Sequence, residues 1–512
     1  MAAEVSVDPA LEQPIDDHPA GVYRLAYVVA FAALSASVPY LTPGLERFQV
    51  WAPGDPIPFA GLIELWPTPR AGSSIGGAIG ASTVSGQSDE ALLSEAPLPS
   101  PLQNVQVSSA QEPPTTEVSI LKLSPSEYEG LTQDIEDPDG VMRHFYGALH
   151  AVHAQEPGAL ARLSFYGTST NGADRVTHVL REQFNRAFGD GGKGWIPIAP
   201  GWQYQVHQDV SWSHRSWRTS VVNRGTEQNG RYGLGGVLAR NAGIGSRASF
   251  GTADADGELN RSVSRFILFY QAYPEGGSLV ATVEGGEPRT LSTAASEVED
   301  RTLEIPVPGG SHTLKIGVDE GRLKLYGVVM EGDGPGVVVD GLMLIGAFTR
   351  VLLNFDSDHI AEQVRQRGSD LLVFWMGAND AVSTSVPYER DEYVRRYATI
   401  LERFRRARAD LSCIVMSVLD KGVRNHGRIR TRDRVPDLVD AQREAARTAG
   451  CAFFNTYEAI GGAGTMRRWY RHQPRLVTAD LGHLTAPGSR IVGTLFYKAL
   501  VKGYGDWLAE NP

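Results

Sequence analysis

The sequence alternates between strand and helix patterns in two separate regions, with a β-rich block between them. Before the block, the apolar run 160–166 predicts a strand, and residues 174–188 have helical spacing that ends at Gly189. After the block, apolar runs alternate with helical patterns in the order 371–376, 388–408, 413–418, 436–449, 451–454 and 486–500. This alternation is typical of a parallel sheet that helices cover on both faces.

The β-rich block extends from about residue 197 to residue 338 and contains short runs with period-two alternation. Turn residues separate its strand candidates, which include 264–270, 277–283, 312–318 and 323–330. Closely spaced short strands indicate an all-β sandwich. Two domains in tandem would not leave half of the α/β pattern before the block. We therefore expect one three-layer α/β domain, formed by residues 119–196 and 339–512, that an inserted β-sandwich at 197–338 interrupts.

The first 118 residues predict an export segment and a tether. Residues 1–45 form a leader in which the stretch 25–45 carries no charge, and about 20 apolar residues suffice to span a membrane. An uncleaved anchor is favoured because the residues before it are acidic, unlike those of an ordinary signal peptide. A cleaved signal and a buried helix are the alternatives. Residues 46–118 are largely rich in Gly, Ser, Pro and Thr and predict a flexible linker.

Composition excludes several classes of protein. The net charge of −11 argues against a general nucleic-acid binder. The cluster Arg403, Arg405, Arg406 and Arg408 is interpreted as one solvated helix face. The two cysteines, Cys413 and Cys451, are too few for a disulfide scaffold or a cysteine zinc site. Each opens an apolar run, so a disulfide between neighbouring strands and two buried free thiols both stay open.

Three short segments supply the residue types of one hydrolase active site. They are Gly167-Thr168-Ser169, Gly377-Ala378-Asn379-Asp380 and Asp480-Leu481-Gly482-His483. The first two follow strand candidates, and ligands of open α/β sheets bind beyond the carboxyl ends of the strands. A serine, an amide donor and an Asp-x-x-His pair suit acyl transfer through a serine nucleophile. Each segment alone is explained by a helix cap, a turn or a surface loop, but their joint occurrence favours a shared site.

These segments resemble the sequence blocks of the SGNH (GDSL-like) hydrolases, a three-layer α/β family of esterases and lipases. The resemblance covers about residues 138–196 and 339–512. It implies that Ser169 is the nucleophile and that Asp480 and His483 complete the triad. It also implies an oxyanion hole formed by the N–H groups of Ser169 and Gly346 and the side-chain amide of Asn379. No metal or organic cofactor is implied.

One position departs from the family pattern. Thr168 stands where the family has an aspartate, and Thr170 follows the nucleophile. The triad carboxylate comes from Asp480, so Thr168 does not remove it. A hydroxyl forms weaker hydrogen bonds than a carboxylate does. This departure favours an alternative function, a catalytically inactive protein that binds glycan.

The position of the insertion narrows the resemblance. A β-sandwich like a carbohydrate-binding module, placed between the first and second blocks, is similar to the arrangement in bacterial peptidoglycan O-acetylesterases. The stretches 326–329, 334–340, 442–445 and 450–454 resemble that family as well. The implied substrate is an O-acetylated polysaccharide, with peptidoglycan as the first expectation. A polysaccharide O-acetyltransferase that uses the same triad is a further alternative.

The N-terminal segment, the net charge and the resemblance together imply a location and a set of partners. We expect the protein on the periplasmic or extracellular side of the cell envelope, anchored to the inner membrane by its N-terminal segment and without a nucleic-acid partner.

Four tryptophans near the start of the insertion could stack on sugar rings, although core packing is the favoured role for most of them. They are Trp195, Trp202, Trp212 and Trp217.

Overall fold

The computed structural model describes residues 130–202, 205–253 and 259–511. The predicted leader 1–45 and linker 46–118 lie outside these residues, as does the start of the segment 119–196. Among the helices within the described ranges, none is both long and apolar enough to span a bilayer.

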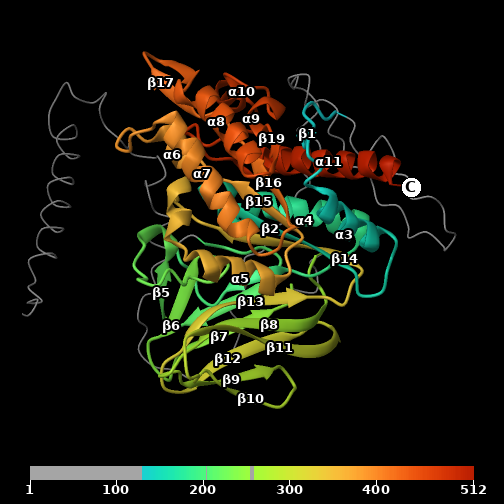
Figure 1. Cartoon of the computed structure of the whole chain (residues 1–512), viewed down its shortest axis with the longest axis vertical. Coiled ribbons are helices and arrows are strands. Elements are labelled where there is room, and N and C mark those ends of the chain that lie inside the picture. Colours follow the sequence, from blue (N-terminus) through green and yellow to red (C-terminus); the bar gives the residue numbers. More distant parts are fainter. Residues whose placement is uncertain (1–129, 203–204, 254–258, 512) are drawn as a thin grey trace, which may run out of the picture. The chain divides into compact units, whose positions relative to one another are not determined.

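A six-stranded mixed sheet forms the centre of the α/β part (Figure 1). Its order is β1 (Ile135–Glu136), β19 (Ala452–Phe454), β16 (Ser412–Met416), β15 (Leu371–Trp375), β2 (Leu160–Gly167) and β14 (Gly336–Met343). All neighbouring strands run parallel except β1, which pairs antiparallel with β19. The predicted parallel sheet is confirmed, and β1 is an added antiparallel edge.

Helices cover both faces of this sheet because successive strand residues point to opposite sides. In β15, Val373 joins the core under α3 (Arg143–His153), α4 (Arg175–Phe188) and α11 (Ala486–Glu510). Its neighbour Phe374 joins the core under α5 (Ser357–Arg367), α7 (Arg390–Arg405) and α8 (Arg434–Thr448). All five residues of β15 are buried. Each such side chain contributes about 1.5–3 kcal/mol by leaving water.

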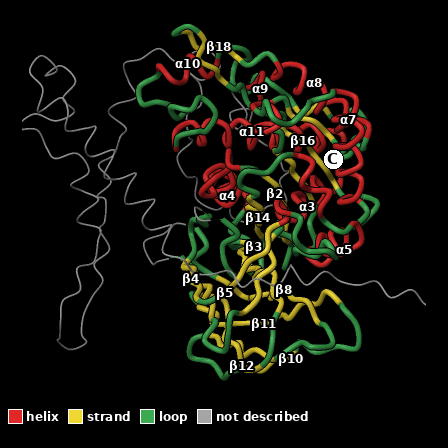
Figure 2. Tube along the Cα trace, turned by 90° about the vertical axis from the view of Figure 1, so that its left-hand side faces the viewer, coloured by secondary structure: helices red, strands yellow, loops and turns green. Residues whose placement is uncertain are grey.

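The β-rich block contains two antiparallel sheets, which Figure 2 shows gathered apart from most of the helices. One has the order β10-β9-β12-β7-β4, and the other β11-β8-β13-β6-β5 with β3 beside β13. The two sheets share a buried core that includes Phe250, Phe266 and Leu314. The strands are β3 (Gly194–Pro197), β4 (Ser211–Arg215), β5 (Trp217–Val221), β6 (Val237–Asn241), β7 (Arg247–Gly251), β8 (Val263–Ala272), β9 (Ser278–Val283), β10 (Arg289–Ser292), β11 (Glu299–Gly310), β12 (Thr313–Glu320) and β13 (Lys324–Glu331).

The borders of the block fall inside strands. The block begins with β3, which pairs with β13, and β14 returns the chain to the parallel sheet beside β2. The predicted borders at 197 and 338 lie at the end of β3 and within β14. The four residues of β3 are all buried, so they show no alternation that would mark them as part of the block.

Buried charges join the block to the α/β part. Glu331 of β13 accepts hydrogen bonds from Arg162 of β2, Arg265 of β8 and Arg367 of α5. Burial raises the pKa of Glu331, but the three guanidinium groups lower this pKa by more than burial raises it. The carboxylate of Glu331 therefore stays ionised. Trp195 is 1% exposed and belongs to a core cluster that combines residues of the block with residues of the α/β part, which agrees with the packing role predicted for it. The block is therefore packed firmly against the sheet.

Several smaller elements lie near the carboxyl ends of the strands. They are η6 (Ser169–Asp174), η7 (Val222–Arg224), η8 (Thr349–Asn354), α6 (Ala378–Val382), α9 (Thr456–Ala459), α10 (Thr465–Arg471) and the hairpin of β17 (Gly422–Asn425) with β18 (Arg428–Thr431). Cys413 in β16 is bonded to Cys451, which immediately precedes β19. Of the two alternatives for the cysteines, the structure contains the disulfide.

Candidate active site

Strand register brings three of the predicted site residues to one edge of the sheet. Gly167, the last residue of β2, pairs with Met343 of β14 on one side and Trp375 of β15 on the other. Ser169 follows Gly167, Gly346 follows Met343 and Asn379 follows Trp375, each within about four positions along the sequence. The parallel sheet thus gathers the segments that carry them.

Ser169 opens the turn η6, and Asn171 fixes that turn to the next helix. The Asn171 Oδ1 accepts hydrogen bonds from the N–H groups of Val176 and Thr177 at 2.9 and 3.2 Å, at the start of α4. A Cβ on Gly167 would lie 3.1 Å from the Asn171 Cβ, so the chain needs a small residue where it leaves β2. Ser169 itself is half-buried. The turn therefore presents its hydroxyl from a fixed backbone.

Ser169, His483 and Asp480 form a continuous hydrogen-bonded chain. The Ser169 Oγ lies 2.8 Å from the His483 Nε2, and the His483 Nδ1 lies 2.5 Å from the Asp480 Oδ2. The Asp480 Oδ1 accepts hydrogen bonds from the Thr478 hydroxyl and the Gly482 and His483 N–H groups. Burial raises the pKa of Asp480, but hydrogen bonds from Thr478, His483 and Gly482 lower it well below its ordinary value. An ionised carboxylate therefore orients the imidazole toward the serine.

The segment between β16 and β17 holds the loop that carries His483. The Gly422 N–H donates to the carbonyl of Leu481 at 2.9 Å, and the Lys421 Nζ donates to the carbonyl of Gly482 at 2.5 Å. Lys421 is 3% exposed. Its burial lowers its pKa to about 8, although Asp480 and Asp420 act in the opposite direction. Two successive carbonyls of the loop are thus fixed, and the Lys421 charge faces the site carboxylate.

Further contacts complete this loop. The Arg175 guanidinium of α4 donates to the carbonyl of Leu484 at 2.9 Å. Thr485 caps α11 by accepting a hydrogen bond from the Gly488 N–H, as its place before a helical pattern predicts. Lys421 and Arg175 belong to no recognisable sequence block, so sequence reasoning missed both.

The backbone of Gly346 is open to solvent. Gly346 has a φ of +78°, and no atom lies within 4 Å of the position that its Cβ would take. The Asn223 side-chain amide, from the β-rich block, donates to the carbonyl of Ile345 at 2.8 Å. The loop after β14 is therefore supported by a residue of the insertion.

Asn379 occupies the first turn of α6 beside that loop. Its Nδ2 donates to the carbonyl of Ala347 at 2.9 Å, and a primary amide has a second N–H to offer. Gly377 before it has a φ of +96°, and a Cβ there would lie 2.5 Å from the Gln442 Nε2. Only glycine fits this position.

Thr168 is fully buried, and its hydroxyl lies 3.5 Å from that of Thr170. That contact is weak by its length. The nearby buried carboxylate of Asp174 is bonded to Lys193 and Arg181 instead. In the described residues, the site of the expected family aspartate thus contains a hydroxyl and no substitute carboxylate.

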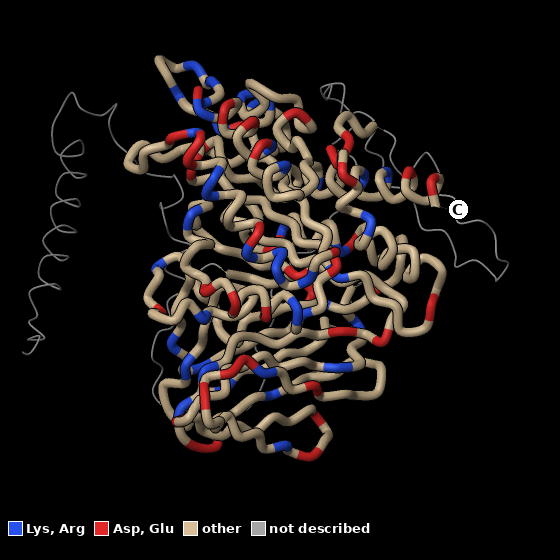
Figure 3. The backbone as a smooth tube through the Cα atoms, in the orientation of Figure 1, with Lys and Arg blue, Asp and Glu red and all other residues tan. Residues whose placement is uncertain are grey.

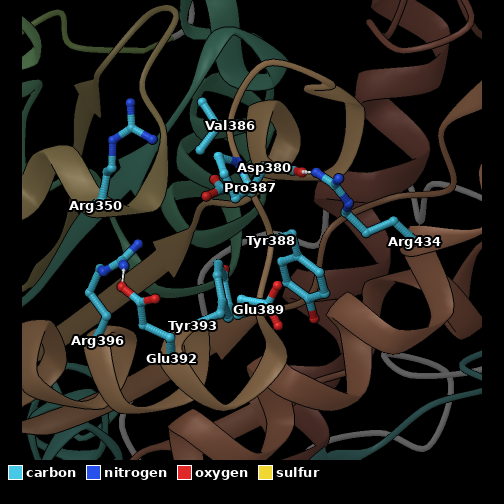
Figure 4. Close-up of a pocket in the computed structure, with 10 residues that line it drawn as sticks. All are labelled: Arg350, Asp380, Val386, Pro387, Tyr388, Glu389, Glu392, Tyr393, Arg396 and Arg434. Atoms are coloured by element: carbon cyan, nitrogen blue, oxygen red, sulfur yellow. Dashed lines mark hydrogen bonds and ion pairs between the residues drawn. The ribbon is translucent and has the colours of Figure 1, made fainter.

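Two residues of this hydrogen-bonded chain lie partly open to solvent. The side chains of His483 and Asp480 are 46% and 53% exposed. A polar hollow of about 370 Å³ is lined by Asp380 of α6 and by Tyr388, Arg350 and Arg434, among others (Figure 4). The Asp380 carboxylate accepts hydrogen bonds from the Thr349 N–H and hydroxyl, and burial raises its pKa. Within the described ranges, no cluster of three or more His, Cys, Asp or Glu is placed to share a metal ion.

Replacing Lys421 with methionine is expected to lower kcat about 10- to 100-fold and to leave KM nearly unchanged, because the loop that carries His483 loses the hydrogen bond that Lys421 donates to it.

The free energy of unfolding should also respond to pH. The folded chain releases the Lys421 proton near pH 8 and the unfolded chain near its ordinary value of 10.5. Between these values the unfolded chain binds more protons, so the stability of the parent rises with pH relative to the variant.

Urea unfolding of both proteins at pH 7 and pH 9.5 measures this difference, and kcat is measured with a small acetyl ester. Lys421→Arg, which keeps a charged donor, should recover part of the lost kcat. Lys315→Met, at a residue whose side chain is 58% exposed, serves as the control and should change neither quantity. Equal pH dependence in the parent and Lys421→Met would contradict the lowered pKa.

Comparison with known proteins links the geometry to a family. Residues 335–491 match the model of the GDSL-like Lipase/Acylhydrolase family. A solved structure of a peptidoglycan O-acetylesterase is 21% identical, covers 70% of this chain and 96% of that chain, and has a TM-score of 0.59. The described fold is therefore that of this structure, inserted block included. A search of curated proteins finds no match.

More distant solved structures include two carbohydrate esterases. A family 2 enzyme with a carbohydrate binding domain, from Corynascus thermopiles, is 12% identical, covers 58% of this chain and 100% of that chain, and has a TM-score of 0.26. A family two enzyme from Cellvibrio japonicus is 12% identical, covers 48% of this chain and 88% of that chain, and has a TM-score of 0.18.

Proposed function

Because residues 335–491 match the model of the GDSL-like Lipase/Acylhydrolase family, we propose that the protein is a serine esterase that removes O-acetyl groups from a polysaccharide, with peptidoglycan as the first substrate to test. The hydrogen-bonded chain from Ser169 through His483 to Asp480 carries this proposal. The likeness in fold to a peptidoglycan O-acetylesterase, which includes the inserted block, supports the choice of substrate.

The proposed mechanism is acyl transfer in two steps. The His483 Nε2 takes the proton of Ser169 while the Oγ attacks the acetyl carbonyl, and the imidazolium then gives this proton to the departing sugar oxygen. Water, deprotonated by His483, attacks the acetyl-enzyme, and acetate leaves as Ser169 regains its proton. The Asp480 carboxylate stabilises the imidazolium in both steps. The N–H groups of Ser169 and Gly346 and the amide of Asn379 would stabilise the tetrahedral oxyanion.

The exposure of the triad supports a polymeric substrate. With His483 and Asp480 about half exposed, a sugar chain can lie across the site without entering a deep pocket. A lipase acting on long acyl chains needs apolar surface near its site, whereas the hollow that Asp380 lines has mainly charged and tyrosine side chains.

The proposed location is the cell envelope, on the periplasmic or extracellular side. The disulfide between Cys413 and Cys451 supports an oxidising compartment. Anchoring by the apolar stretch 25–45 belongs to the same proposal.

A second candidate function is glycan binding without catalysis. The observation that favours it is the buried Thr168 where the family has an aspartate. The 2.8 Å contact between the Ser169 Oγ and the His483 Nε2 favours the esterase instead.

Acetate release by the full chain from O-acetylated peptidoglycan tests the proposal, with acetylated xylan and a long-chain ester as comparison substrates. We expect release from peptidoglycan to be fastest. Release of acetate only from xylan would indicate that the substrate is a polysaccharide other than peptidoglycan. No release from any ester by a folded sample would favour the binding function, and acetyl transfer to an added acceptor glycan in place of release would indicate a transferase.

Asn379→Ala should lower kcat about 10²- to 10³-fold, or about 2.7–4 kcal/mol in the barrier, because an oxyanion donor is lost. Asn223→Ala is the matched control, since it also removes an amide that binds a carbonyl of the loop around Gly346. Asn223 donates to Ile345, and we expect its loss to lower kcat less than about tenfold. Similar losses in both variants would mean that Asn379 only supports the loop.

A further inference from the structure

A concentrated arginine surface lies on the β17–β18 hairpin, on α10 and on the loop that follows. Residues 421–434 contain six Lys or Arg and one Asp, and residues 463–475 contain four Arg and no acid, in a chain with 48 basic and 59 acidic residues. Figure 3 marks the hairpin as a run of Lys and Arg. The exposed members, named here the arginine surface, are Arg424, Arg428, Arg430, Arg467, Arg468, Arg471 and Arg475.

The two segments form one continuous surface. The Gly464 N–H, before α10, donates to the Thr431 hydroxyl of β18 at 2.8 Å. The guanidinium groups of Arg424 and Arg475 lie over the Tyr470 ring, 4.8 and 4.5 Å from its centroid. Stacking on one ring holds two like charges close together. The hairpin, the helix and the loop therefore present their charges as a unit.

Among the described residues, these charges lack carboxylate partners. Within the part of the chain that the structure describes, no ion pair joins any residue of the arginine surface to an acidic side chain. Arginines elsewhere do pair, as the exposed Arg406 does with Asp358 and the half-buried Arg408 with Asp410. Uncompensated guanidinium groups repel one another, so the surface is best stabilised by an external anion.

The arginine surface adjoins the candidate active site. Gly422 of β17 donates to the carbonyl of Leu481, two residues before His483. A hollow of about 670 Å³ lies between α6, which carries Asn379, and the hairpin. Its lining includes Ala381 and Val382 of α6 and Arg430 of the hairpin. The hollow therefore lies between the helix that carries Asn379 and the arginine surface.

We propose that the acetylated polysaccharide is a carboxylate-bearing polymer and that the arginine surface binds its charges beside the site of hydrolysis. This inference rests on the proposed esterase function. A guanidinium binds a carboxylate with two parallel hydrogen bonds. Repeated charges along one chain let several weak contacts act together, and such binding weakens as salt rises.

Binding of the full chain to polygalacturonate, compared with the same polymer methyl-esterified to neutrality, tests the proposal. We expect binding to polygalacturonate alone, with a Kd that rises steeply with salt. The triple variant Arg424→Gln, Arg428→Gln and Arg430→Gln should weaken it about tenfold or more. The control triple Arg289→Gln, Arg395→Gln and Arg447→Gln changes the net charge equally at exposed sites and should change the Kd less than about twofold.

Several results would overturn the proposal. They are equal binding of the neutral polymer, an equal loss in the control triple, or tighter binding of poly(glycerol phosphate) than of polygalacturonate. Binding to vesicles of phosphatidylglycerol and phosphatidylcholine, but not to polygalacturonate, would assign the surface to a membrane instead. Hydrolysis of 4-nitrophenyl acetate is followed in parallel and should be equal in the parent and both triples. Its absence from the parent would count against the esterase, while the binding data still decide the role of the arginines.

Discussion

Replacing Ser169 with alanine is expected to lower kcat for acetate release by about 10⁶-fold, the loss typical of removing a serine nucleophile. In the proposed mechanism the Oγ forms the bond to the acetyl carbon, and water bound in its place would lack its fixed position. The residual rate would come from the oxyanion donors and substrate binding alone. Acetate release by the parent and the variant measures the effect, and mass spectrometry should detect a trapped acetyl-enzyme in the parent.

Stability should hardly change in this variant. Ser169 is half-buried, and its hydroxyl contacts His483, whose side chain is 46% exposed. Ser383→Ala is the control, because that serine ends α6 near the site and its hydroxyl bonds to Ser385 and to the Val386 N–H. It should retain nearly full activity. A Ser169→Ala protein with more than about 1% of the parental kcat would exclude Ser169 as the nucleophile.

Replacing Asp480 with asparagine is expected to lower kcat about 10⁴-fold. The Asp480 Oδ1 accepts the N–H groups of Gly482 and His483, so the single oxygen of an asparagine amide would stay there. Its NH₂ group would then face the His483 Nδ1, which must become an acceptor. The proton would move to Nε2, where it blocks uptake of the Ser169 proton.

The pH dependence of the parent offers a check on Asp480. Its pKa lies well below the ordinary value of 3.8, so protonation of this carboxylate should not reduce activity between pH 5 and pH 8. Thr478→Val removes one of its hydrogen bonds and should cost only about tenfold or less. If Asp480→Asn kept more than about a tenth of the activity, another group would have to orient the imidazole.

Much of the α/β fold follows from local sequence. The run 371–376 is apolar throughout because β15 is buried on both faces, and its short length distinguishes it from a helix. The order of Ser169, Asn379, Asp480 and His483 predicted that they share a sheet edge, and strand pairing and hydrogen bonds place them together. Their catalytic roles stay predictions.

Other features leave no readable pattern in the sequence. The β17–β18 hairpin carries arginines where a core-facing strand would carry apolar residues, since half or more of each strand is exposed. Lys421 acts through the carbonyl of Gly482, sixty-one positions away, and such contacts cannot be read from either segment alone. The choice between a disulfide and free thiols likewise depended on whether Cys413 and Cys451 meet in space.

The buried carboxylate of Glu331 limits how this chain can be divided. Glu331 belongs to the β-rich block, but two of its three arginine partners, Arg162 and Arg367, belong to the α/β part. Excising the block would remove Glu331, so the fully buried guanidinium of Arg367 would keep only one of its two carboxylate partners, Asp340. An uncompensated buried charge costs several kcal/mol. The insertion is therefore not a detachable accessory, and exchanging it between related enzymes requires both halves of this charge cluster to be transplanted together.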